Sequence, residues 1–186
     1  PQEMGLALGQ AEVTPLEMTR FVATIANGGN LTRGVPVISA KDLLGRERIM
    51  YSPIGDQVLR SEPAALLREL MRLVITSGTG YNSRGVGRYS GYKGPAIGKT
   101  GTTDQNKDLW FIGSTPQYAA ALWIGLDKPE NLMASASDYA APLWGWWMEE
   151  LHKDIDEDTD FQGLALKSKT VCMDTGKYAN KTCPLI

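Results

Sequence analysis

The chain has 186 residues, of which 42% are hydrophobic and 22% charged, a composition close to that of an average globular protein. Its net charge of -2 and its lack of a basic run argue against non-specific binding to nucleic acid. No apolar run approaches the roughly 20 residues of a membrane span, and no signal peptide opens the sequence, which begins with Pro1. We therefore interpret the chain as a piece of a longer protein.

The first predicted element is a helix with a clear start signal. Thr14-Pro15-Leu16-Glu17 combines a capping box with proline at the first helical position, and Asn27-Gly28-Gly29 supplies a stop. The broad apolar face of this helix consists of Leu16, Met18, Phe21, Val22 and Ile25. Within residues 35–53, two short strands are expected on either side of a turn at Leu44-Gly45-Arg46.

The middle of the chain is predicted to hold a second helix and a long loop. The helix covers residues 61–78, with Ser61 as its cap and Gly78 as its stop. Residues 79–94 are rich in glycine and polar residues, which is typical of a loop.

Three strands are expected next, at residues 95–101, 109–115 and 119–127, where aromatic and β-branched residues gather. A turn centred on Pro116 joins the last two of them. Because the connections are short, we predict an antiparallel meander.

The last predicted helix covers residues 139–154, and its Trp-rich stripe at helical spacing favours a side that faces the core. The residues expected on this buried side are Leu143, Trp144, Trp147, Met148 and Leu151. His152 lies in a charged run and is expected to be solvated. After Asp154 the chain becomes polar and acidic, so we divide it into a domain portion, 1–154, and a tail, 155–186.

The tail contains the two cysteines of the chain, Cys172 and Cys183. Their spacing, with turn-forming residues between them, favours a disulfide that closes a small loop in an oxidising compartment, with two separate thiols as the alternative. A metal site is not expected, because the single histidine, His152, is distant in sequence and two thiolates alone make a poor zinc site.

The stretch GPAIGKTGTT, residues 94–103, resembles a phosphate-binding loop by its letters. A Walker loop needs a glycine at position 93, where the sequence has Lys93, and a helix directly after the motif. The residues that follow Thr103 are strand-like instead. The context therefore argues against a nucleotide phosphate and leaves Lys-Thr-Gly on a strand.

Lys-Thr-Gly on a strand, followed by an antiparallel pair and a closing helix, resembles the penicillin-recognising serine transpeptidases and β-lactamases. Five ordered segments between residues 5 and 152 look like the C-terminal part of bifunctional, class A penicillin-binding proteins: EVTPLEMTRFVATIANGG, SGTG, GKTGTTDQNKDLWFIGSTPQY, WIGLD and AAPLW. The resemblance implies an α+β fold, an antiparallel sheet packed by helices, without the N-terminal part that bears the serine.

Two motifs of that family are missing from the chain. The nucleophile of the family is the serine of Ser-x-x-Lys, which should lie far upstream of Lys99. Ser90-Gly91-Tyr92-Lys93 matches by letters, but it lies in a glycine-rich loop directly before Lys99 and not at the start of a buried helix. Ser-x-Asn does not occur. We therefore expect both motifs in a segment upstream of residue 1.

The resemblance implies a role for each residue of the remaining motif. Lys99 supplies a positive charge that favours the substrate carboxylate and helps relay the serine proton. The hydroxyls of Thr100 and Thr102 bind the terminal carboxylate of a D-Ala-D-Ala stem peptide or of a β-lactam, and the backbone N–H of Thr102 stabilises the oxyanion. Gly101 avoids a side chain that would crowd the substrate, and Thr103 completes the predicted substrate-binding segment.

The resemblance also implies a parent protein with a glycosyltransferase domain, anchored at the extracytoplasmic face of the bacterial cell membrane, with no metal or organic cofactor. Its partners are peptidoglycan stem peptides, β-lactam antibiotics and the upstream segment that carries the serine, and this chain alone is expected to be inactive. Two alternatives stay open: a non-catalytic module that binds a peptide or a partner at the same strand edge, and a soluble β-lactamase. A serine-bearing upstream segment separates the first alternative from an enzyme, and the tail and the EVTPLEM segment argue against the second.

Overall fold

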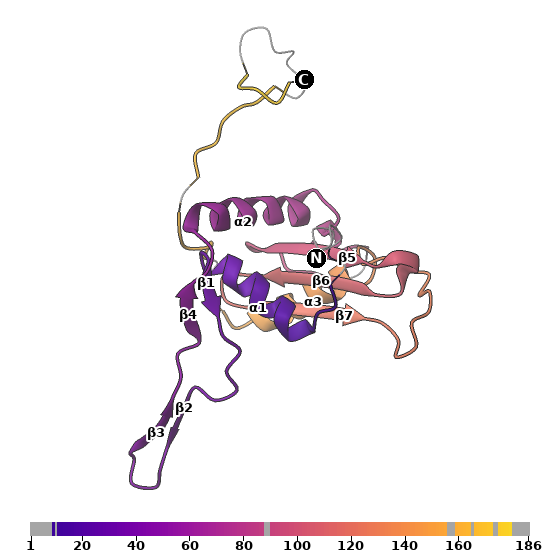
Figure 1. Cartoon of the computed structure of the whole chain (residues 1–186). Helices are drawn as coiled ribbons and strands as arrows, with labels where there is room; N and C mark the ends of the chain where they lie inside the picture. The colour runs from indigo at the N-terminus through magenta and orange to yellow at the C-terminus, as the bar shows by residue number, and fades with distance from the viewer. Residues whose placement is uncertain are drawn as a thin grey trace, which may run out of the picture.

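The molecule is built around a three-stranded antiparallel sheet with helices on both of its faces, which confirms the α+β prediction (Figure 1). The computed structural model describes residues 9, 11–87, 90–155, 159–164, 166–172 and 175–179. The helices are α1 (Pro15–Ala26), α2 (Ser61–Thr76) and α3 (Ala140–His152). The strands of the sheet are β5 (Ile97–Thr102), β6 (Leu109–Ser114) and β7 (Ala119–Ile124), in the order β5-β6-β7. The predicted meander is therefore confirmed.

Helix α1 begins with the predicted capping box. The Glu17 backbone N–H donates to Thr14 Oγ1 at 3.2 Å, and the Thr14 N–H donates to Glu17 Oε2 at 2.8 Å. The buried apolar residues of α1 are Val22 and Ile25. Leu16 and Phe21, which we assigned to the same apolar face, are 60% and 53% exposed, so the face that packs is narrower than the sequence suggests.

A hairpin projects from the body at one end (Figure 1). It pairs β2 (Ser39–Lys41) with β3 (Glu47–Met50), which confirms the two strands predicted around the turn. At its base, β1 (Asn30–Thr32) pairs with β4 (Ile54–Gln57), and neither strand was predicted. Each of these two strands contains a single large apolar residue and is flanked by glycine, asparagine or proline, which indicate turns.

Helix α2 has no side-chain cap, which corrects the role given to Ser61. The N-cap is Arg60, whose side chain makes no cap hydrogen bond, and Ser61 is the first helical residue. Ser61 Oγ instead accepts a hydrogen bond from Gln57 Nε2 at 3.0 Å. The predicted stop at Gly78 is confirmed, directly after the C-cap, whereas the loop predicted after it contains a 3₁₀ helix, η2 (Tyr81–Arg84).

Two core clusters hold the layers together. One joins the sheet to α3 through Leu109, Phe111, Trp144 and Met148, and the other joins it to α1 through Val22, Ile25 and Ile97. Helix α2 contributes Ile75 to the first cluster and Met71 to the second. It therefore packs along the β5 side of the sheet and contacts both clusters (Figure 1).

The buried side of α3 differs from the predicted one. Trp144 and Met148 are buried as expected, but Leu143, Trp147 and Leu151 are 44%, 40% and 38% exposed. These three residues repeat at intervals of four and form a stripe of their own. The neighbouring stripe, which contains the small residues Ala140, Ala141 and Gly145, faces the sheet and η2. Small residues allow closer packing, so hydrophobicity alone correctly selected Trp144 and Met148 but added three residues of the wrong stripe.

His152 is not the solvated residue that its charged surroundings suggested. Its Nε2 lies 3.0 Å from Thr115 Oγ1, and its Nδ1 lies 2.7 Å from the Met148 carbonyl oxygen. Its ring is 4.3 Å from the Tyr92 ring, centroid to centroid, and 5.2 Å from that of Tyr118. The histidine thus connects the end of α3 to the turn between β6 and β7.

The chain that follows α3 returns to α2. Arg72 Nη2 donates to Asp160 Oδ1 at 2.9 Å, and the guanidinium of buried Arg68 donates to the carbonyl oxygens of Ala26 and Gln162. Burial alone would raise the pKa of Asp160. Hydrogen bonds from Arg72 and from the Phe161 backbone N–H, with the charges of Arg72 and Arg68, outweigh it and lower this pKa.

This lowered pKa predicts a small loss of stability in acid. The unfolded state binds a proton at higher pH than the folded state. The pairing of Asp160 with Arg72 therefore stabilises the fold fully above the ordinary pKa of an aspartate, and this stabilisation is lost as the pH falls through the lowered pKa of the folded state. Asp160→Asn should therefore reduce the unfolding free energy by about 0.2–1 kcal/mol near pH 7, because the carboxylate is largely exposed. In urea unfolding the difference between the two proteins should be smaller near pH 2.5 than near pH 7, because the wild-type carboxyl is protonated to a larger extent in acid. An equal difference at both pH values would contradict the pairing.

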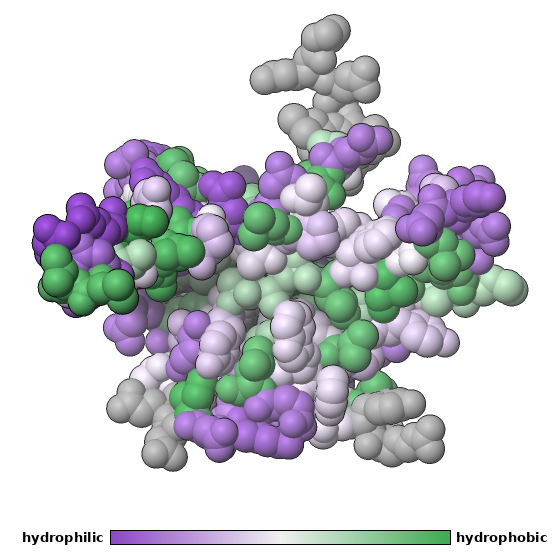
Figure 2. All heavy atoms as spheres, turned by 90° about the horizontal axis from the view of Figure 1, so that it is seen from below, coloured by the Kyte–Doolittle hydropathy of each residue, from purple (hydrophilic) through white to green (hydrophobic). Residues whose placement is uncertain are grey.

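Of the helices in the described ranges, none has the length and apolar character needed to cross a membrane. Hydrophobic and hydrophilic residues are interspersed on the face seen from below, on the β7 side of the sheet (Figure 2). Among the described residues no strand pairs with the outer edge of β7, or with that of β5. Within the described residues, neither edge of the sheet is therefore continued by a further strand, although α2 packs beside β5.

Candidate active site

The Lys-Thr-Gly motif lies within β5, at an open edge of the sheet. Thr100 pairs with Phe111 and Thr102 with Leu109, so β6 covers one side of the strand. The opposite side has no strand partner among the described residues. A strand here, in place of a loop that leads into a helix, agrees with the rejection of a phosphate-binding loop.

The backbone register determines which groups of β5 face the open edge. The Thr103 N–H donates to the Asp108 carbonyl oxygen at 3.1 Å, one position beyond the pair of Thr102 and Leu109. Groups directed toward the partner alternate along an antiparallel strand, so Gly101 also turns its N–H toward β6. The N–H and C=O groups of Thr100 and Thr102 are therefore directed to the open edge.

Lys99 reaches this edge with its side chain. Its Nζ donates to the Thr100 carbonyl oxygen at 2.7 Å, and the residue is exposed. Since Thr100 and Thr102 are two residues apart, their hydroxyls lie on one face of the strand, and Lys99 lies next to them in sequence with its side chain on the other. The strand thus presents an ammonium group, two hydroxyls and two outward N–H groups, which together suit an anionic ligand.

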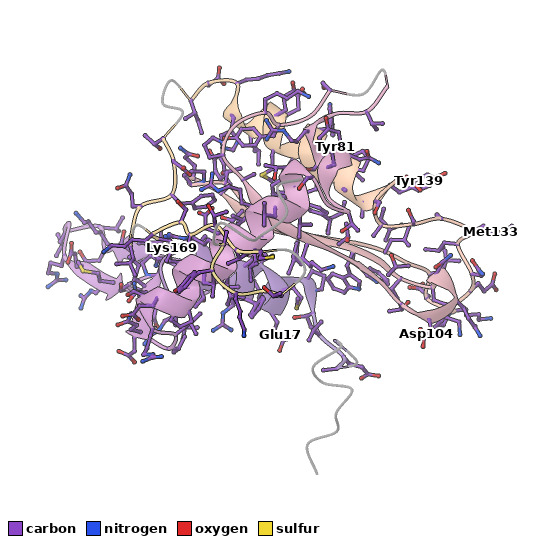
Figure 3. All side chains as sticks on the ribbon, turned by 90° about the horizontal axis from the view of Figure 1, so that it is seen from above. Glu17, Tyr81, Asp104, Met133, Tyr139 and Lys169 are labelled. Atoms are coloured by element: carbon purple, nitrogen blue, oxygen red, sulfur yellow. The ribbon has the colours of Figure 1, made fainter. Side chains whose placement is uncertain are left out.

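The two hydroxyls have further partners. Thr100 Oγ1 lies 2.6 Å from Thr79 Oγ1, and Thr102 Oγ1 accepts a hydrogen bond from the Ala136 N–H at 3.3 Å. Ala136 belongs to the segment between β7 and α3, which returns across the end of β5. In Figure 3, Asp104 and Met133 lie at the same end of the molecule, where β5 leaves the sheet and this segment passes.

Thr103 lies in the turn between β5 and β6. Its hydroxyl donates to Asp108 Oδ2 at 2.9 Å and accepts from the Asp108 backbone N–H at 2.9 Å. The other carboxylate oxygen of Asp108 accepts from Trp123 Nε1 at 2.9 Å. Thr103 thereby fixes the end of the strand, and its contact with a substrate stays a prediction.

Gly101 is closely approached on one side. A Cβ atom added to it would lie 3.2 Å from Trp110 Cβ, so an alanine would require a small shift of the neighbouring strand. The crowding of a substrate by a side chain at this position stays a prediction.

The other candidates from the sequence lie away from this strand or outside the described residues. Ser90 lies in a non-helical segment before β5, unlike a nucleophile at the start of a buried helix. Cys172 is buried, and Cys183 lies outside the described residues, so the disulfide between them stays a prediction. Within the described part of the chain, no group of three or more acidic, histidine or cysteine side chains is placed to hold a metal ion.

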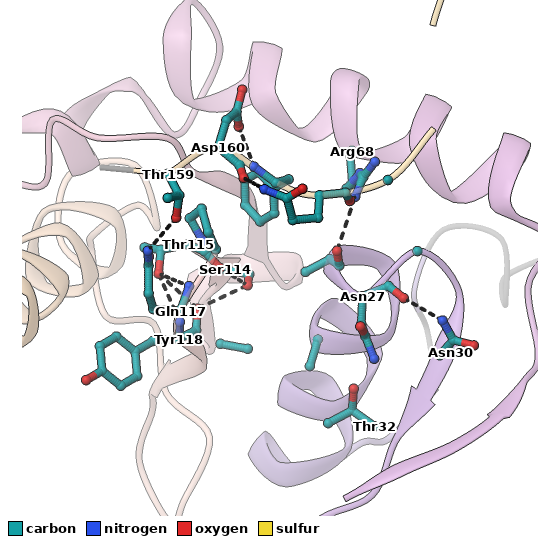
Figure 4. Close-up of a pocket in the computed structure, with 18 of the residues that line it drawn as sticks. Asn27, Asn30, Thr32, Arg68, Ser114, Thr115, Gln117, Tyr118, Thr159 and Asp160 are labelled. Carbon is teal, nitrogen blue, oxygen red and sulfur yellow. Dashed lines mark hydrogen bonds between the residues drawn. The ribbon is translucent and has the colours of Figure 1, made fainter. Parts of the chain in front are cut away.

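A cavity of about 790 Å³ lies elsewhere, between the end of α1, α2 and the turn that follows β6 (Figure 4). Its lining includes Asn27, Arg68, Gln117 and Asp160. Of the described residues that line it, none belongs to 99–103. We therefore place the candidate site at the open edge of β5, because the groups that suit an anionic substrate meet there.

The sequence analysis missed Thr79 and Ala136 as neighbours of the motif. Thr79 lies in Ser77-Gly78-Thr79-Gly80, one of the segments that resemble class A penicillin-binding proteins. The sequence assigns no role to this threonine. Glycines on both sides of a hydroxyl residue are the available signal, because glycine is common where the chain turns tightly or approaches a neighbour closely. Nothing in the local sequence distinguishes Ala136, which contributes a backbone N–H.

Comparison with known proteins agrees with this geometry. Residues 3–148 match the family model for the penicillin binding protein transpeptidase domain. Penicillin-binding protein 1A of Neisseria meningitidis serogroup A is 31% identical over 176 residues, which cover 91% of this chain and 20% of that protein. Penicillin-binding protein 1A of Clostridium tetani is 27% identical over 187 residues, which cover 98% of this chain and 23% of that protein. The chain thus spans about a fifth of the length of the curated relatives it matches.

Solved structures share the fold. Penicillin-binding protein 1A from Haemophilus influenzae superposes with a TM-score of 0.78 at 22% identity, over 98% of this chain and 33% of that one. PonA1 from Mycobacterium tuberculosis in complex with penicillin V superposes with a TM-score of 0.70 at 24% identity, over 100% of this chain and 48% of that one. The fold is therefore part of a larger one, and the chain belongs to the family of penicillin-binding protein transpeptidase domains.

Proposed function

We propose that the chain is the C-terminal portion of a D,D-transpeptidase domain, which cross-links peptidoglycan stem peptides by acyl transfer and is acylated by β-lactams. The observation that carries this proposal is the open edge of β5, where Lys99, Thr100 and Thr102 present groups that suit a carboxylate. The family match supports the same reaction class. A peptide substrate would lie along this edge like an added strand.

The proposed reaction begins with a serine in an upstream segment of the same protein. Its oxygen attacks the carbonyl carbon of the penultimate D-Ala, and the outward N–H of Thr102 stabilises the oxyanion that forms. The hydroxyls of Thr100 and Thr102 bind the terminal carboxylate, and Lys99 adds charge there and helps relay the serine proton to the departing D-Ala amine. An amine of a second stem peptide then attacks the acyl-serine, which forms the cross-link and releases the serine.

Gly101 and Thr103 have supporting roles in this proposal. Gly101 keeps the edge free of a side chain, and Thr103 holds the end of the strand through Asp108. The hydroxyl and the backbone N–H of Thr103 are both bonded to Asp108, so Thr103 would support the end of a substrate-binding strand that presents the groups of Thr100 and Thr102.

The whole protein is proposed to be longer than this chain. We infer a transpeptidase portion at residues 1–154, a tail at 155–186, and an upstream part with the serine, a glycosyltransferase domain and a membrane anchor. Its substrates, the stem peptides, would place it at the extracytoplasmic face of the bacterial membrane. The proposed chemistry uses no metal or organic cofactor, since serine, lysine and backbone N–H groups supply every step.

Covalent labelling by a fluorescent penicillin tests the proposal. The full-length protein should incorporate one equivalent, and peptide mapping should place it on a serine outside residues 1–186. The isolated chain should remain unlabelled, because the nucleophile is absent. One equivalent on Ser90 of the isolated chain would overturn the assignment of the nucleophile.

The same assay separates the alternatives. A full-length protein that binds stem peptide but is never acylated would indicate a non-catalytic binding module. Rapid turnover of the penicillin adduct, with no cross-linking of stem peptides, would indicate a β-lactamase.

A further inference from the structure

A hydrogen bond between two hydroxyls connects β5 to the end of α2. Thr79 Oγ1 and Thr100 Oγ1 are 2.6 Å apart, at the short end of the range for hydroxyl pairs. Thr79 lies between α2 and η2, so this contact joins two elements that are 21 residues apart in sequence. Thr79 is exposed, as expected for a residue beside an open site.

The backbone around Thr79 is held tightly. The N–H groups of Gly78 and Gly80 both donate to the Val74 carbonyl oxygen, at 3.2 Å and 2.9 Å. A Cβ atom on Gly78 would lie 2.8 Å from Val74 Cα, and one on Gly80 would lie 3.1 Å from the Phe111 ring. Both positions therefore require glycine or a shift of their neighbours, and the position of Thr79 follows from this packing.

The number of protons in the pair determines the direction of the bond once a substrate binds. Each hydroxyl has one proton to donate and can also accept. A substrate carboxylate can only accept, so Thr100 must give its proton to the carboxylate. The bond between the two hydroxyls must then run from Thr79 to Thr100, and a hydroxyl that accepts such a bond becomes a stronger donor.

We propose that Thr79 is a positioning residue for substrate binding. Its hydroxyl donates to Thr100 Oγ1 and so directs the Thr100 proton toward the substrate carboxylate. This inference rests on the proposed function, since it requires that Thr100 binds a carboxylate.

Acylation rates of the full-length protein test the inference. Thr79→Val should slow acylation by benzylpenicillin about two- to tenfold, the effect of one neutral hydrogen bond, and Thr79→Ser should restore the rate. In a Thr100→Val background, Thr79→Val should have no further effect, because the two hydroxyls act as one unit. With benzylpenicillin methyl ester, whose uncharged ester oxygens are weaker acceptors than a carboxylate, the Thr79→Val effect should become smaller.

Thr76→Val is the matched control, since Thr76 is an exposed threonine at the end of α2 and should keep the wild-type rate. Thr79→Ala serves as a second variant, and melting curves of all variants show whether the fold is intact.

Failure of this inference and failure of the proposed function give different results. A wild-type rate in folded Thr79→Val and Thr79→Ala, with slow acylation in Thr100→Val, would overturn the role of Thr79 and leave the proposed function standing. Additive effects of the two substitutions, or an equal Thr79→Val effect on the ester, would overturn it as well. No acylation of the wild-type protein would overturn the proposed function itself.

Discussion

Replacement of Lys99 by alanine is expected to slow acylation of the full-length protein by penicillin about 10²- to 10⁴-fold. The ammonium group lies at the open edge of β5, where it donates to the Thr100 carbonyl oxygen. In the proposed mechanism, its removal eliminates both the charge that attracts the substrate carboxylate and a group that relays the serine proton. Proton transfer by a positioned side chain typically contributes a factor of this size.

Thr102→Val should have a smaller effect, about tenfold to hundredfold, because it removes one hydrogen bond to a charged group. The Thr102 backbone N–H, which is proposed to stabilise the oxyanion, remains, so activity should decrease and not vanish. The substitution also removes the acceptor of the Ala136 N–H, so a melting curve must accompany the kinetics. Thr102→Ser keeps both the donor and the acceptor and should retain most of the rate.

Lys41→Ala is the matched control for Lys99→Ala. Lys41 is an exposed lysine on the hairpin that projects away from the sheet (Figure 1). It should keep the wild-type rate. If well-folded Lys99→Ala and Thr102→Val proteins are acylated as fast as the wild type, β5 does not belong to the active site.

Trp144→Ala is expected to have the largest effect on stability, about 3–5 kcal/mol of unfolding free energy. Trp144 is 1% exposed, and its ring lies 5.0 Å from that of Phe111, centroid to centroid. Its Nε1 also donates to the Ala120 carbonyl oxygen at 3.2 Å, which would lose this partner. The substitution therefore leaves a cavity and an unsatisfied acceptor in the layer between β6 and α3.

Two tryptophans of the same helix provide the comparison. Trp146 and Trp147 are 48% and 40% exposed, so Trp146→Ala and Trp147→Ala should each cost well under half as much as Trp144→Ala. Urea unfolding followed by far-UV circular dichroism measures all three variants. Equal losses for Trp144 and Trp147 would restore the buried side that the sequence predicted for α3.

Local sequence signals are sufficient to predict the helices and strands around the Lys-Thr-Gly motif. The capping box at Thr14, the glycine after α2 and the aromatic and β-branched runs of β5, β6 and β7 act over a few residues, and each forms as predicted. The strand position of Lys99 and Thr100 therefore follows from nearby residues alone, whereas the structure extends the strand to Thr102. The prediction of Ser61 as a helix cap was wrong because a serine hydroxyl has several possible partners. Here its partner is the side chain of Gln57, at the end of β4.

Contacts between distant segments could not be predicted from the sequence. Thr79 meets Thr100, and His152 meets Thr115 and Tyr92, only because α2, α3 and the sheet pack together. The residues involved carry no periodic pattern, and their partners are many positions away.

The sequence by itself determined the type and order of the main elements and the presence of Lys-Thr-Gly on a strand, because these depend on local propensity, capping and turn chemistry. The tertiary structure decided that one edge of β5 is open, that Thr100 and Thr102 turn their backbone groups toward it, and that Thr79 and Ala136 join them. It also decided which stripe of α3 is buried, since small residues allow close approach and hydrophobicity does not distinguish the two stripes. Strand partners and close packing are properties of the assembled layers, so no short stretch of the chain contains them.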